Sequence, residues 1–427
     1  MEVLLIALAL TVLALFGTPL FVIISAIALM AFFSADIDSS AVIIELYRLA
    51  SQPVLLAIPL FTFAGYMLAE SKTPQRLVNF SRALMGWMPG SLAIVTLLSC
   101  AVFTAFTGAS GVTIVALGGL LLPALLDDNY SEKFSLGMLT ASGNLGLLFP
   151  PSLPIILYGL VSSTSIDQLF TAGILPGILM VGLLSVYSVW SARRQGVGMK
   201  SLAFDKKRLW QSTREAIWEI PLPFIILGGI YGGFFTATEA AAVTAFYVLI
   251  IEVFIYRDIS LKKDLLRVAR ESMIMVGGIL VILAAALGLA NYLIDAEIPS
   301  AILEAMRGYV DSPFEFLIVL NLFLLVVGAM MDIFSAIMVV APLVIPIAAQ
   351  FNIDPVHLGI IFLANLGIGY STPPVGMNLF IASMRFEQPV MKLYKATIPF
   401  LIILLVSLVI ITYWPDLSLW LVRVMGV

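Results

Sequence analysis

The sequence predicts an all-α integral membrane protein with two re-entrant helical hairpins and two discontinuous helices, arranged as an inverted repeat. Three observations lead to this fold class. Apolar residues make up 61% of the 427 residues and charged residues only 11%, with a mean hydropathy of +1.09. The apolar residues fall in blocks of ~20 or more, long enough to cross a bilayer as helices. A set of Gly and Pro positions also recurs at one fixed offset. Residues 1–427 are therefore expected to form a single membrane unit.

The composition excludes several functional classes. An ordinary soluble protein carries roughly 25% charged residues, and this chain has too few charges to cover a soluble surface. A net charge of −4 with no basic face argues against nucleic-acid binding. One cysteine, Cys100, excludes a disulfide framework, and one histidine, His357, excludes a His-rich zinc or haem site. No nucleophile–base pair or metal triad can be assembled, so we do not expect an enzyme.

Nine crossing helices are expected, and short amphipathic surface pieces lie between them. Glu2 stands where a signal peptide would carry Lys or Arg, and Gly17-Thr18-Pro19 indicates a kink in the first crossing rather than a cleavage site. The crossings lie near 3–33, 53–70, 134–160, 166–190, 220–236, 239–257, 272–294, 355–384 and 396–414. The surface pieces are 40–52, 206–219, 261–271 and 299–308.

Two apolar stretches, 89–126 and 313–349, are too long for one crossing. Each has a break in its middle, Thr107–Gly111 in the first and Gly328–Asp332 in the second. Each stretch fits either two antiparallel spans or a hairpin that turns at mid-depth. Both alternatives return the chain to the side it came from, so charge separates them only weakly. We treat both as re-entrant hairpins.

The distribution of Lys and Arg predicts the orientation. With nine crossings and two returning hairpins, 19 of the 22 basic residues fall on the side of the N-terminus. The exceptions are Arg48, Arg307 and Arg423. Because basic residues concentrate in cytoplasmic loops, the N-terminus is expected to be cytoplasmic and the C-terminus external.

The sequence contains an internal repeat, which appears when the chain is aligned with itself so that Gly65 matches Gly288. We call this shift the repeat offset. It also matches Pro123 with Pro346, Ala141 with Ala364, Gly146 with Gly369, and Pro150-Pro151 with Pro373-Pro374. An odd number of crossings separates the halves, so the repeat is inverted, as in many secondary transporters. The predicted division is a first repeat at 53–195, scaffold helices and arms at 196–271, a second repeat at 272–395, and a C-terminal scaffold helix at 396–427.

The broken helices, 134–160 and 355–384, supply candidate binding groups. Gly and Pro in Ser142–Ser152 and in Asn365–Pro374 oppose helix formation, so these segments are expected to unwind inside the membrane. Freed carbonyl oxygens with Ser, Thr and Asn side chains suit an alkali cation, and half-helix N-termini favour an anion. We expect the anion near Ser142, Pro150, Ser152, Asn365 and Pro373.

Charged residues at membrane depth are further candidates. Asp332, with Ser335 beside it in the second hairpin tip, is a functional candidate because ionisable residues are rare there. Its alternatives are a solvated tip or an N-cap for the following helix. Glu239 is expected in the first turn of a helix capped by Thr238; a proton relay is the less favoured alternative, and its role stays open.

Five blocks in order resemble the large membrane subunit of TRAP (tripartite ATP-independent periplasmic) transporters, the DctM-like permeases. The blocks are FTAFTGASGVTIVALGGLLLPAL at 103–125, SGNLGLLFPPSLPIILYG at 142–159, GGFFTATEAAAV at 232–243, GAMMDIFSAIMVVAPLVIP at 328–346 and NLGIGYSTPPVGMNLF at 365–380. The resemblance covers essentially the whole chain. It implies sodium-coupled import of a small organic anion (a dicarboxylate, sialic acid, or another sugar or keto acid) across the bacterial or archaeal cytoplasmic membrane by an elevator movement.

The resemblance also implies partners and ion sites. A periplasmic binding protein would deliver the substrate, and a separately encoded four-helix subunit would support this chain, which shows no spare four-helix segment. Two or more Na⁺ ions would be transported. The first sodium site would use Thr107, Gly108, Ser110, Gly143, Asn144 and Gly146. The second would use Gly328, Asp332, Gly367, Gly369 and Thr372. A stand-alone divalent-anion/sodium symporter and an ion channel with two re-entrant loops are the alternatives.

Overall fold

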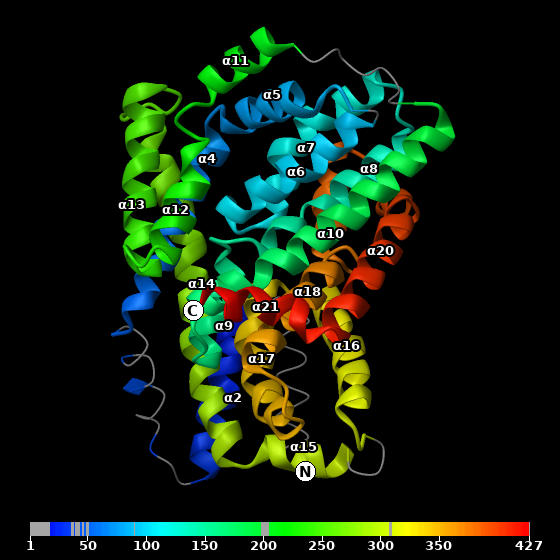
Figure 1. Cartoon of the computed structure of the whole chain (residues 1–427). Helices are drawn as coiled ribbons and strands as arrows, with labels where there is room; N and C mark the ends of the chain where they lie inside the picture. The colour runs from blue at the N-terminus through cyan, green and yellow to red at the C-terminus, as the bar shows by residue number, and fades with distance from the viewer. Residues whose placement is uncertain are drawn as a thin grey trace.

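The computed structural model describes residues 18–35, 38, 43–44, 47, 51–88, 90–197, 205–306 and 310–426. These residues form helices and connecting turns without a β-strand, which confirms the all-α class (Figure 1). Within this part of the chain, eight helices are long and apolar enough to cross a membrane. A ninth is the pair Glu132–Leu148 and Leu153–Ser162, bent by 46°.

Two groups of helices make up the molecule. In the first group, α4 packs on α13 and α14, α2 packs on α14, and α12 packs on α13; in Figure 1 α12 and α13 lie to the left of α10 and α20. This group comprises α2 (Leu20–Ser34), α4 (Ala57–Glu70), α12 (Pro221–Tyr231), α13 (Ala237–Leu249) with the π-helical turn η3 (Ile250–Ile255), and α14 (Leu265–Asp295). The short turn η1 (Pro53–Leu56) leads into α4.

The second group contains the hairpins and the broken helices. The hairpins are α6 (Ser91–Thr107) with α7 (Ser110–Asp127), and α16 (Pro313–Met330) with α17 (Ile333–Gln350). The broken helices are α8 (Glu132–Ser142), η2 (Leu145–Leu148) and α9 (Leu153–Ser162), and α18 (Pro355–Gly369) with α19 (Met377–Phe386). Packed on them are α10 (Ile166–Gln195), α20 (Val390–Tyr413) and α21 (Pro415–Met425).

Three short helices lie at the two ends of the molecule. Figure 1 shows α5 (Thr73–Met85) and α11 (Lys206–Glu215) across one end and α15 (Ile298–Met306) across the other. Local sequence explains where such elements start. Asp205 caps α11 by accepting from the N–H of Lys207 at 2.8 Å, and Ser312 with Glu315 forms a capping box before α16.

The internal repeat is visible in the helix boundaries. The repeat offset carries both ends of α7 onto the ends of α17, and it places Pro123 on Pro346 inside these helices. The same offset carries the start of α10 to the position just before the start of α20. The division of the chain into repeats and scaffold stays a prediction.

One backbone contact also recurs at this offset. A Cβ placed on Gly146 would lie 2.5 Å from the backbone N of Ala105, and one on Gly369 would lie 2.6 Å from the backbone C of Gly328. Ala105 and Gly328 are themselves related by the repeat offset. Each broken helix therefore touches the backbone of the first helix of its own hairpin, and only glycine permits that approach.

Several details differ from the sequence expectations. Residues 261–271 do not form a separate surface piece, because α14 runs unbroken from Leu265 to Asp295. The predicted crossing 220–236 is the eleven-residue helix α12, and α5 was not expected as a helix. The predicted last crossing, 396–414, corresponds to the longer helix α20 (Val390–Tyr413), which packs on α8, α10 and α18.

The cap of α13 also differs from the expectation. Thr236, not Thr238, is the N-cap, and it forms a capping box with Glu239. The Thr238 hydroxyl instead donates to the backbone oxygen of Pro53 at 3.3 Å. Both carboxylate contacts of Glu239 go to Thr236, which accounts for this residue as a helix cap.

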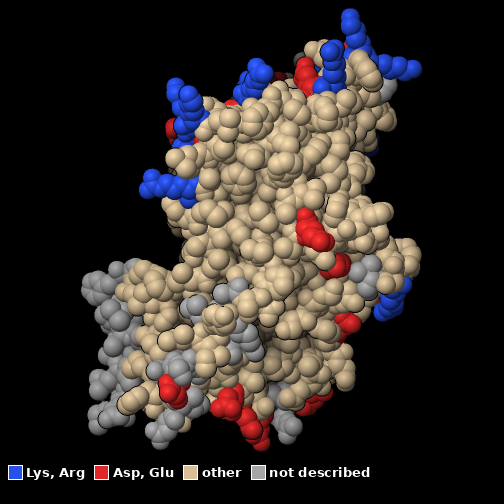
Figure 2. All heavy atoms as spheres, turned by 90° about the vertical axis from the view of Figure 1, so that its left-hand side faces the viewer, with Lys and Arg blue, Asp and Glu red and all other residues tan. Residues whose placement is uncertain are grey.

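Parts of the predicted N-terminal region lie outside the described residues, namely residues 1–17 of the first crossing and most of the surface piece 40–52. The described residues show strong charge segregation. Figure 2 shows Lys and Arg gathered at the end that carries α5 and α11, above a broad belt of uncharged side chains, with Asp and Glu dominating the opposite end. We call the end with α5 and α11 the basic end.

The recurring glycine contact yields a test of the repeat. Gly146→Ala and Gly369→Ala each force a methyl group against backbone, so each is expected to lower the free energy of unfolding by about 1–3 kcal/mol. Thermal unfolding of the purified protein in lipid nanodiscs measures the loss. Gly182→Ala is the matched control, since nothing lies within 4 Å of a Cβ there. A loss in only one of the two variants would contradict equivalent packing.

Candidate functional site

The first hairpin tip is a tight turn between α6 and α7. Gly108 ends α6 in a left-handed conformation with φ 66°. A Cβ on Gly108 would lie 2.7 Å from Cγ of Leu153 at the start of α9. Both the backbone angle and the lack of space require glycine, and Ser110 then starts α7. The tip is thereby seated against the first broken helix.

Threonines of this hairpin contact the point where the first broken helix stops. α8 ends at Ser142, and the carbonyl oxygen of Gly143 accepts a hydrogen bond of 3.0 Å from the Thr104 hydroxyl. Thr104 Oγ1 lies 2.6 Å from Thr113 Oγ1 on the other arm of the hairpin. A carbonyl at a helix break thus finds its partner inside the protein, as membrane depth requires.

A chain of four buried polar side chains joins the tip to both broken helices. Ser110 donates to Oδ1 of Asn378 at 2.8 Å, and Nδ2 of Asn378 donates to Oδ1 of Asn144 at 2.7 Å. Nδ2 of Asn144 then donates to the Ser371 hydroxyl at 2.9 Å. All four side chains are at most 4% exposed. We call Ser110, Asn378, Asn144 and Ser371 the polar chain; it fixes the two repeats relative to each other.

The second hairpin tip is held by side-chain and backbone contacts. Asp332 is the N-cap of α17: one carboxylate oxygen accepts from the N–H of Ser335 at 2.9 Å, and the other accepts from the Ser335 hydroxyl. The capping alternative for Asp332 is therefore confirmed. The N–H of Ile333 donates to the Tyr370 hydroxyl, and the N–H of Gly376 donates to the carbonyl of Ala329 at 2.9 Å.

The Asp332 carboxylate retains capacity for a ligand. An ionised carboxylate offers about four lone-pair sites, and the two contacts with Ser335 leave some of them free. The side chain is only half-buried, so the carboxylate is accessible from the space beside the tip.

A cavity of about 710 Å³ lies where the two tips approach each other. Gly108 and Ser110 line it from the first tip, Asp332 from the second, and Tyr370 from the second broken helix. Glu70 at the end of α4 lines it from the other helix group, and Glu70 pairs with Arg267 at 2.6 Å. This volume is within the ~300–1,000 Å³ usual for small-molecule sites.

Comparison with known proteins agrees with this arrangement. Residues 4–417 match the family described as "Tripartite ATP-independent periplasmic transporter, DctM component". The chain belongs to the DctM family. This confirms the resemblance read from the five sequence blocks, and it places the chain in a class of transporter permeases rather than in an enzyme class.

Two relatives illustrate the range of the family. The chain is 35% identical to the C4-dicarboxylate TRAP transporter large permease protein DctM of Rhodobacter capsulatus, over 99% of this chain and 98% of that protein. It is 36% identical to the isethionate TRAP transporter permease protein DctMQ of Oleidesulfovibrio alaskensis, over 86% of this chain and 58% of that protein.

A solved structure shares the fold. The YdaH transporter of Alcanivorax borkumensis, described as having an unusual topology, superposes with a TM-score of 0.62 over 88% of this chain and 87% of that chain. The sequence identity is 14%, so the likeness concerns the fold alone.

The predicted ion ligands of this DctM protein are distributed unevenly around the cavity. Gly108, Ser110 and Asp332 line it. Thr107, Gly143, Asn144 and Gly146 lie behind the first tip, buried in the packing between α6, η2 and the polar chain. Gly328, Gly367, Gly369 and Thr372 lie behind the second tip, where the Thr372 hydroxyl donates to the carbonyl of Ile368 at 2.9 Å.

The predicted anion ligands do not line this cavity. Ser142 donates to the carbonyl of Leu139 at 3.1 Å, and Nδ2 of Asn365 donates to Oδ1 of Asn321 at 2.6 Å. Pro150 borders an apolar cavity of about 410 Å³ on the far side of α6. The buried Ser152 hydroxyl and Pro373 are likewise absent from the cavity wall.

Sequence reasoning missed three residues of this centre, Asn378, Ser371 and Tyr370. Asn378 is fully buried and central to the polar chain. Its signal was available, because an Asn in an apolar segment beside a Pro-Pro break needs a hydrogen-bond partner. Its partners are 234 and 268 residues away in sequence, so no local pattern identifies them.

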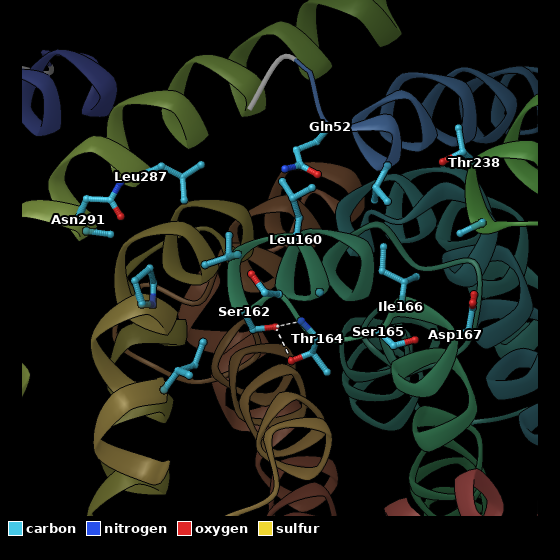
Figure 3. A pocket seen from close by; sticks show the side chains of 18 of the residues that line it. Gln52, Leu160, Ser162, Thr164, Ser165, Ile166, Asp167, Thr238, Leu287 and Asn291 are labelled. Carbon is cyan, nitrogen blue, oxygen red and sulfur yellow. Dashed lines mark hydrogen bonds between the residues drawn. The ribbon is translucent and has the colours of Figure 1, made fainter. Parts of the chain in front are cut away.

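A second cavity of about 770 Å³ lies between the two helix groups (Figure 3). Asn291 in its wall is near the end of α14 that leads into α15, so this cavity lies toward the end opposite the basic end (Figure 1). Gln52, Thr238 and Asn291 face it from one group, and the loop around Ser162 and Thr164 faces it from the other. The Ser162 hydroxyl donates to the Thr164 hydroxyl at 2.9 Å. α17 thus borders both cavities, with Ile333 at its start lining the first and Pro342 and Pro346 lining the second.

The polar chain yields a stability test. Asn144→Ala and Asn378→Ala each leave buried polar atoms without partners, so each is expected to lower the free energy of unfolding by about 1–3 kcal/mol. A double-mutant cycle should show coupling of about 0.5–3 kcal/mol. The control is Asn291→Ala on the cavity of Figure 3. Additive losses with no coupling would contradict the direct contact.

Proposed function

We propose that this DctM protein is the large membrane subunit of a TRAP transporter that imports a small organic anion together with Na⁺. The observation that carries this proposal is the convergence of two hairpin tips and two broken helices on one cavity, to which the tips contribute the carboxylate of Asp332. Helix ends at membrane depth present partial charges to ions and substrates. Such an arrangement suits ion-coupled transport rather than bond chemistry.

The available ligands favour an alkali cation. Among the described residues, no three His, Cys, Asp or Glu side chains gather to hold a metal ion. The oxygens near the tips come from hydroxyl, amide and backbone groups with Asp332, which suits Na⁺ better than zinc or iron. Of the residues proposed for the two sodium sites, Gly108, Ser110 and Asp332 line the cavity, and the others lie behind the tips. An inward-moving Na⁺ gains about 2.3 kcal/mol per 100 mV of membrane potential.

The substrate is proposed to be a small organic acid. The matched relatives are named for C4-dicarboxylate and isethionate, and a cavity of about 710 Å³ accommodates compounds of that size. A dicarboxylate is our first candidate; sialic acid and other sugar or keto acids fit the same cavity. The final choice of substrate is proposed to lie with the periplasmic binding protein.

The two helix groups support an elevator movement. Glu70, which lines the cavity between the tips, ends α4 just before α5 of the basic end. Asn291, which lines the cavity of Figure 3, lies near the end of α14 that leads into α15 at the opposite end (Figure 1). If the hairpin group slides along α4 and α14, one cavity closes as the other widens. That is the alternating access that an importer needs.

Two partners follow from the proposal. A tripartite system comprises this component, a small membrane subunit and a periplasmic binding protein, and the DctMQ relative is a longer chain of which this one spans 58%. We propose that the small subunit is a separate four-helix protein. We propose that the basic end faces the cytoplasm across a bacterial or archaeal cytoplasmic membrane, because basic residues concentrate on the cytoplasmic side. The N-terminus, which lies outside the described residues, is proposed to be cytoplasmic and the C-terminus external.

Asp332→Asn separates the two roles of this carboxylate. Asn caps helices as well as Asp, so the variant should fold normally while losing the negative charge. We expect sodium activation of uptake to weaken on the order of tenfold, which corresponds to ~1.4 kcal/mol. Uptake is measured in proteoliposomes that also contain the small subunit, with the binding protein and labelled organic acid added outside.

The matched control is Glu315→Gln, a capping carboxylate at the other end of α16, for which sodium activation should not change. Unchanged sodium activation in Asp332→Asn would show that Asp332 is only a cap. Uptake without the binding protein would favour a stand-alone symporter. Ion conductance that persists without substrate movement would favour a channel.

Cysteine labelling tests the proposed orientation. The only native cysteine, Cys100, is buried, and Lys207 and Arg423 are exposed. In a Cys100→Ala background, a membrane-impermeant maleimide added to intact spheroplasts should label Arg423→Cys. It should label Lys207→Cys only after permeabilisation, because position 207 belongs to the basic end. The reverse pattern would overturn the topology.

A further inference from the structure

A buried ion cluster at the basic end joins the α5 arm to the helices around α14. Nη1 of Arg76 in α5 pairs with Oε1 of Glu219, and Nη2 pairs with Oδ2 of Asp258. Oε2 of Glu252 lies 3.9 Å from Nη1. One guanidinium is therefore shared by three carboxylates, of which Glu219 is 143 and Asp258 is 182 residues away from Arg76 in sequence. We call these four residues the Arg76 cluster.

The cluster holds more negative than positive charge. The side chains of Glu219, Glu252 and Asp258 are 2%, 0% and 7% exposed, and that of Arg76 is 12% exposed. Lys72 is the other cation near the cluster; its side chain is 79% exposed and its Nζ lies 3.9 Å from Asp258. Burying two uncompensated carboxylates is strongly unfavourable, so the cluster needs another positive charge.

Hydrogen-bond geometry indicates which carboxyl groups bind the additional positive charge. The Thr73 hydroxyl oxygen lies 2.8 Å from Oε1 of Glu219 and 3.0 Å from Oε1 of Glu252. A hydroxyl has a single hydrogen and can donate it fully to one of these oxygens. The other contact is attractive only if that carboxyl itself carries a proton and donates to Thr73. The remaining oxygens, Oε2 of Glu219 and of Glu252, are buried without a hydrogen-bond partner.

The other groups that face the cluster supply no further cation. The ring of Tyr256 lies under the Arg76 guanidinium, with 3.7 Å from Cζ to the ring centroid, and its hydroxyl donates to the carbonyl of Glu215 at 2.6 Å. The Tyr247 hydroxyl donates to the carbonyl of Trp218 at 2.8 Å. Among the ion pairs of the described residues, only Lys72 and Arg76 contact these carboxylates.

The backbone at Glu252 is also unusual. Glu252 lies in the six-residue π-helical turn η3 that continues α13, where the ordinary helical hydrogen-bond pattern changes. Such turns are rare and are frequently found at functional sites. Here the π-helical turn brings the fully buried Glu252 side chain toward α5, where it joins the Arg76 cluster.

We propose that the Arg76 cluster is a proton-binding site in which Glu219 and Glu252 share one proton. Glu252 donates this proton to the Thr73 oxygen, and Thr73 donates its own hydrogen to Glu219. The remaining charge is one carboxylate each from Glu219 and Asp258, facing Arg76 and the exposed Lys72. The bound proton thereby holds the α5 arm, which leads directly into the first hairpin, against α13.

Burial supports this assignment, because it raises the pKa of Glu219 even though Arg76 opposes the shift. A carboxyl whose pKa is higher in the folded than in the unfolded state binds a proton that the unfolded chain has released. The free energy of unfolding then falls as pH rises from the unfolded value through the raised folded value. The inference does not rest on the proposed sodium coupling or substrate.

Infrared spectroscopy of the full-length protein in nanodiscs tests the proposal directly. At neutral pH we expect the carbonyl band of a protonated carboxyl group, shifted in D₂O. It should disappear in both Glu219→Gln and Glu252→Gln, since either replacement supplies the neutral partner and leaves the other carboxylate ionised beside Arg76. The control Glu304→Gln, an exposed carboxylate in α15, should keep the band.

Thermal unfolding against pH gives an independent readout. The unfolding temperature of the native protein should fall between mildly acidic and mildly alkaline pH, and this fall should be smaller in Glu252→Gln but unchanged in Glu304→Gln. Absence of the infrared band in the native protein, or an equal pH dependence in Glu252→Gln, would overturn the proposal. Stabilisation by Na⁺ or K⁺ that is lost in Glu252→Gln, with no band, would assign the cluster to a metal cation instead.

Discussion

Backbone polar groups have no water to bind in the hydrocarbon layer, and this constraint governs every helix break in the protein. Each broken helix is covered by the hairpin of its own repeat. The carbonyl of Gly143 is bound by Thr104, and the carbonyl of Ala329 in the second hairpin is bound by the N–H of Gly376. The breaks can exist at membrane depth because the hairpins supply the hydrogen-bond partners that water would otherwise supply.

The same constraint explains the role of glycine and the polar chain. A hairpin can cover a break only if the two backbones come very close, and the contacts of Gly146 with Ala105 and of Gly369 with Gly328 provide that approach. Side-chain amides then connect one covered break to the other through Asn144 and Asn378. Backbone proximity organises each half, and side-chain hydrogen bonds join the halves.

Much of this architecture could be predicted from the sequence because Gly, Pro and hydropathy act locally. The breaks at 107–111 and 328–332 fall where the hairpins turn, and the repeat offset matches helix boundaries. The contacts between side chains could not be predicted, because Ser110 and Asn378 come together only through the packing of the two inverted halves. The α5 helix escaped notice because its mixed polar sequence lacks a strong apolar signal, and the three carboxylates around Arg76 lie far from Arg76 in sequence.

The correspondence of α5 with α15 in the repeat has a consequence for membrane insertion of the protein. The repeat offset carries Thr73–Met85 to residues 296–308, the region of α15, and these two helices lie at opposite ends of the molecule. The two halves share a backbone fold, so the fold alone does not determine which side of the membrane each half faces when it is inserted. The orientation must come from flanking charge, such as Arg76 and Arg82 in α5 against Glu304 in α15. The two halves share a shape but differ in charge, so they are not interchangeable.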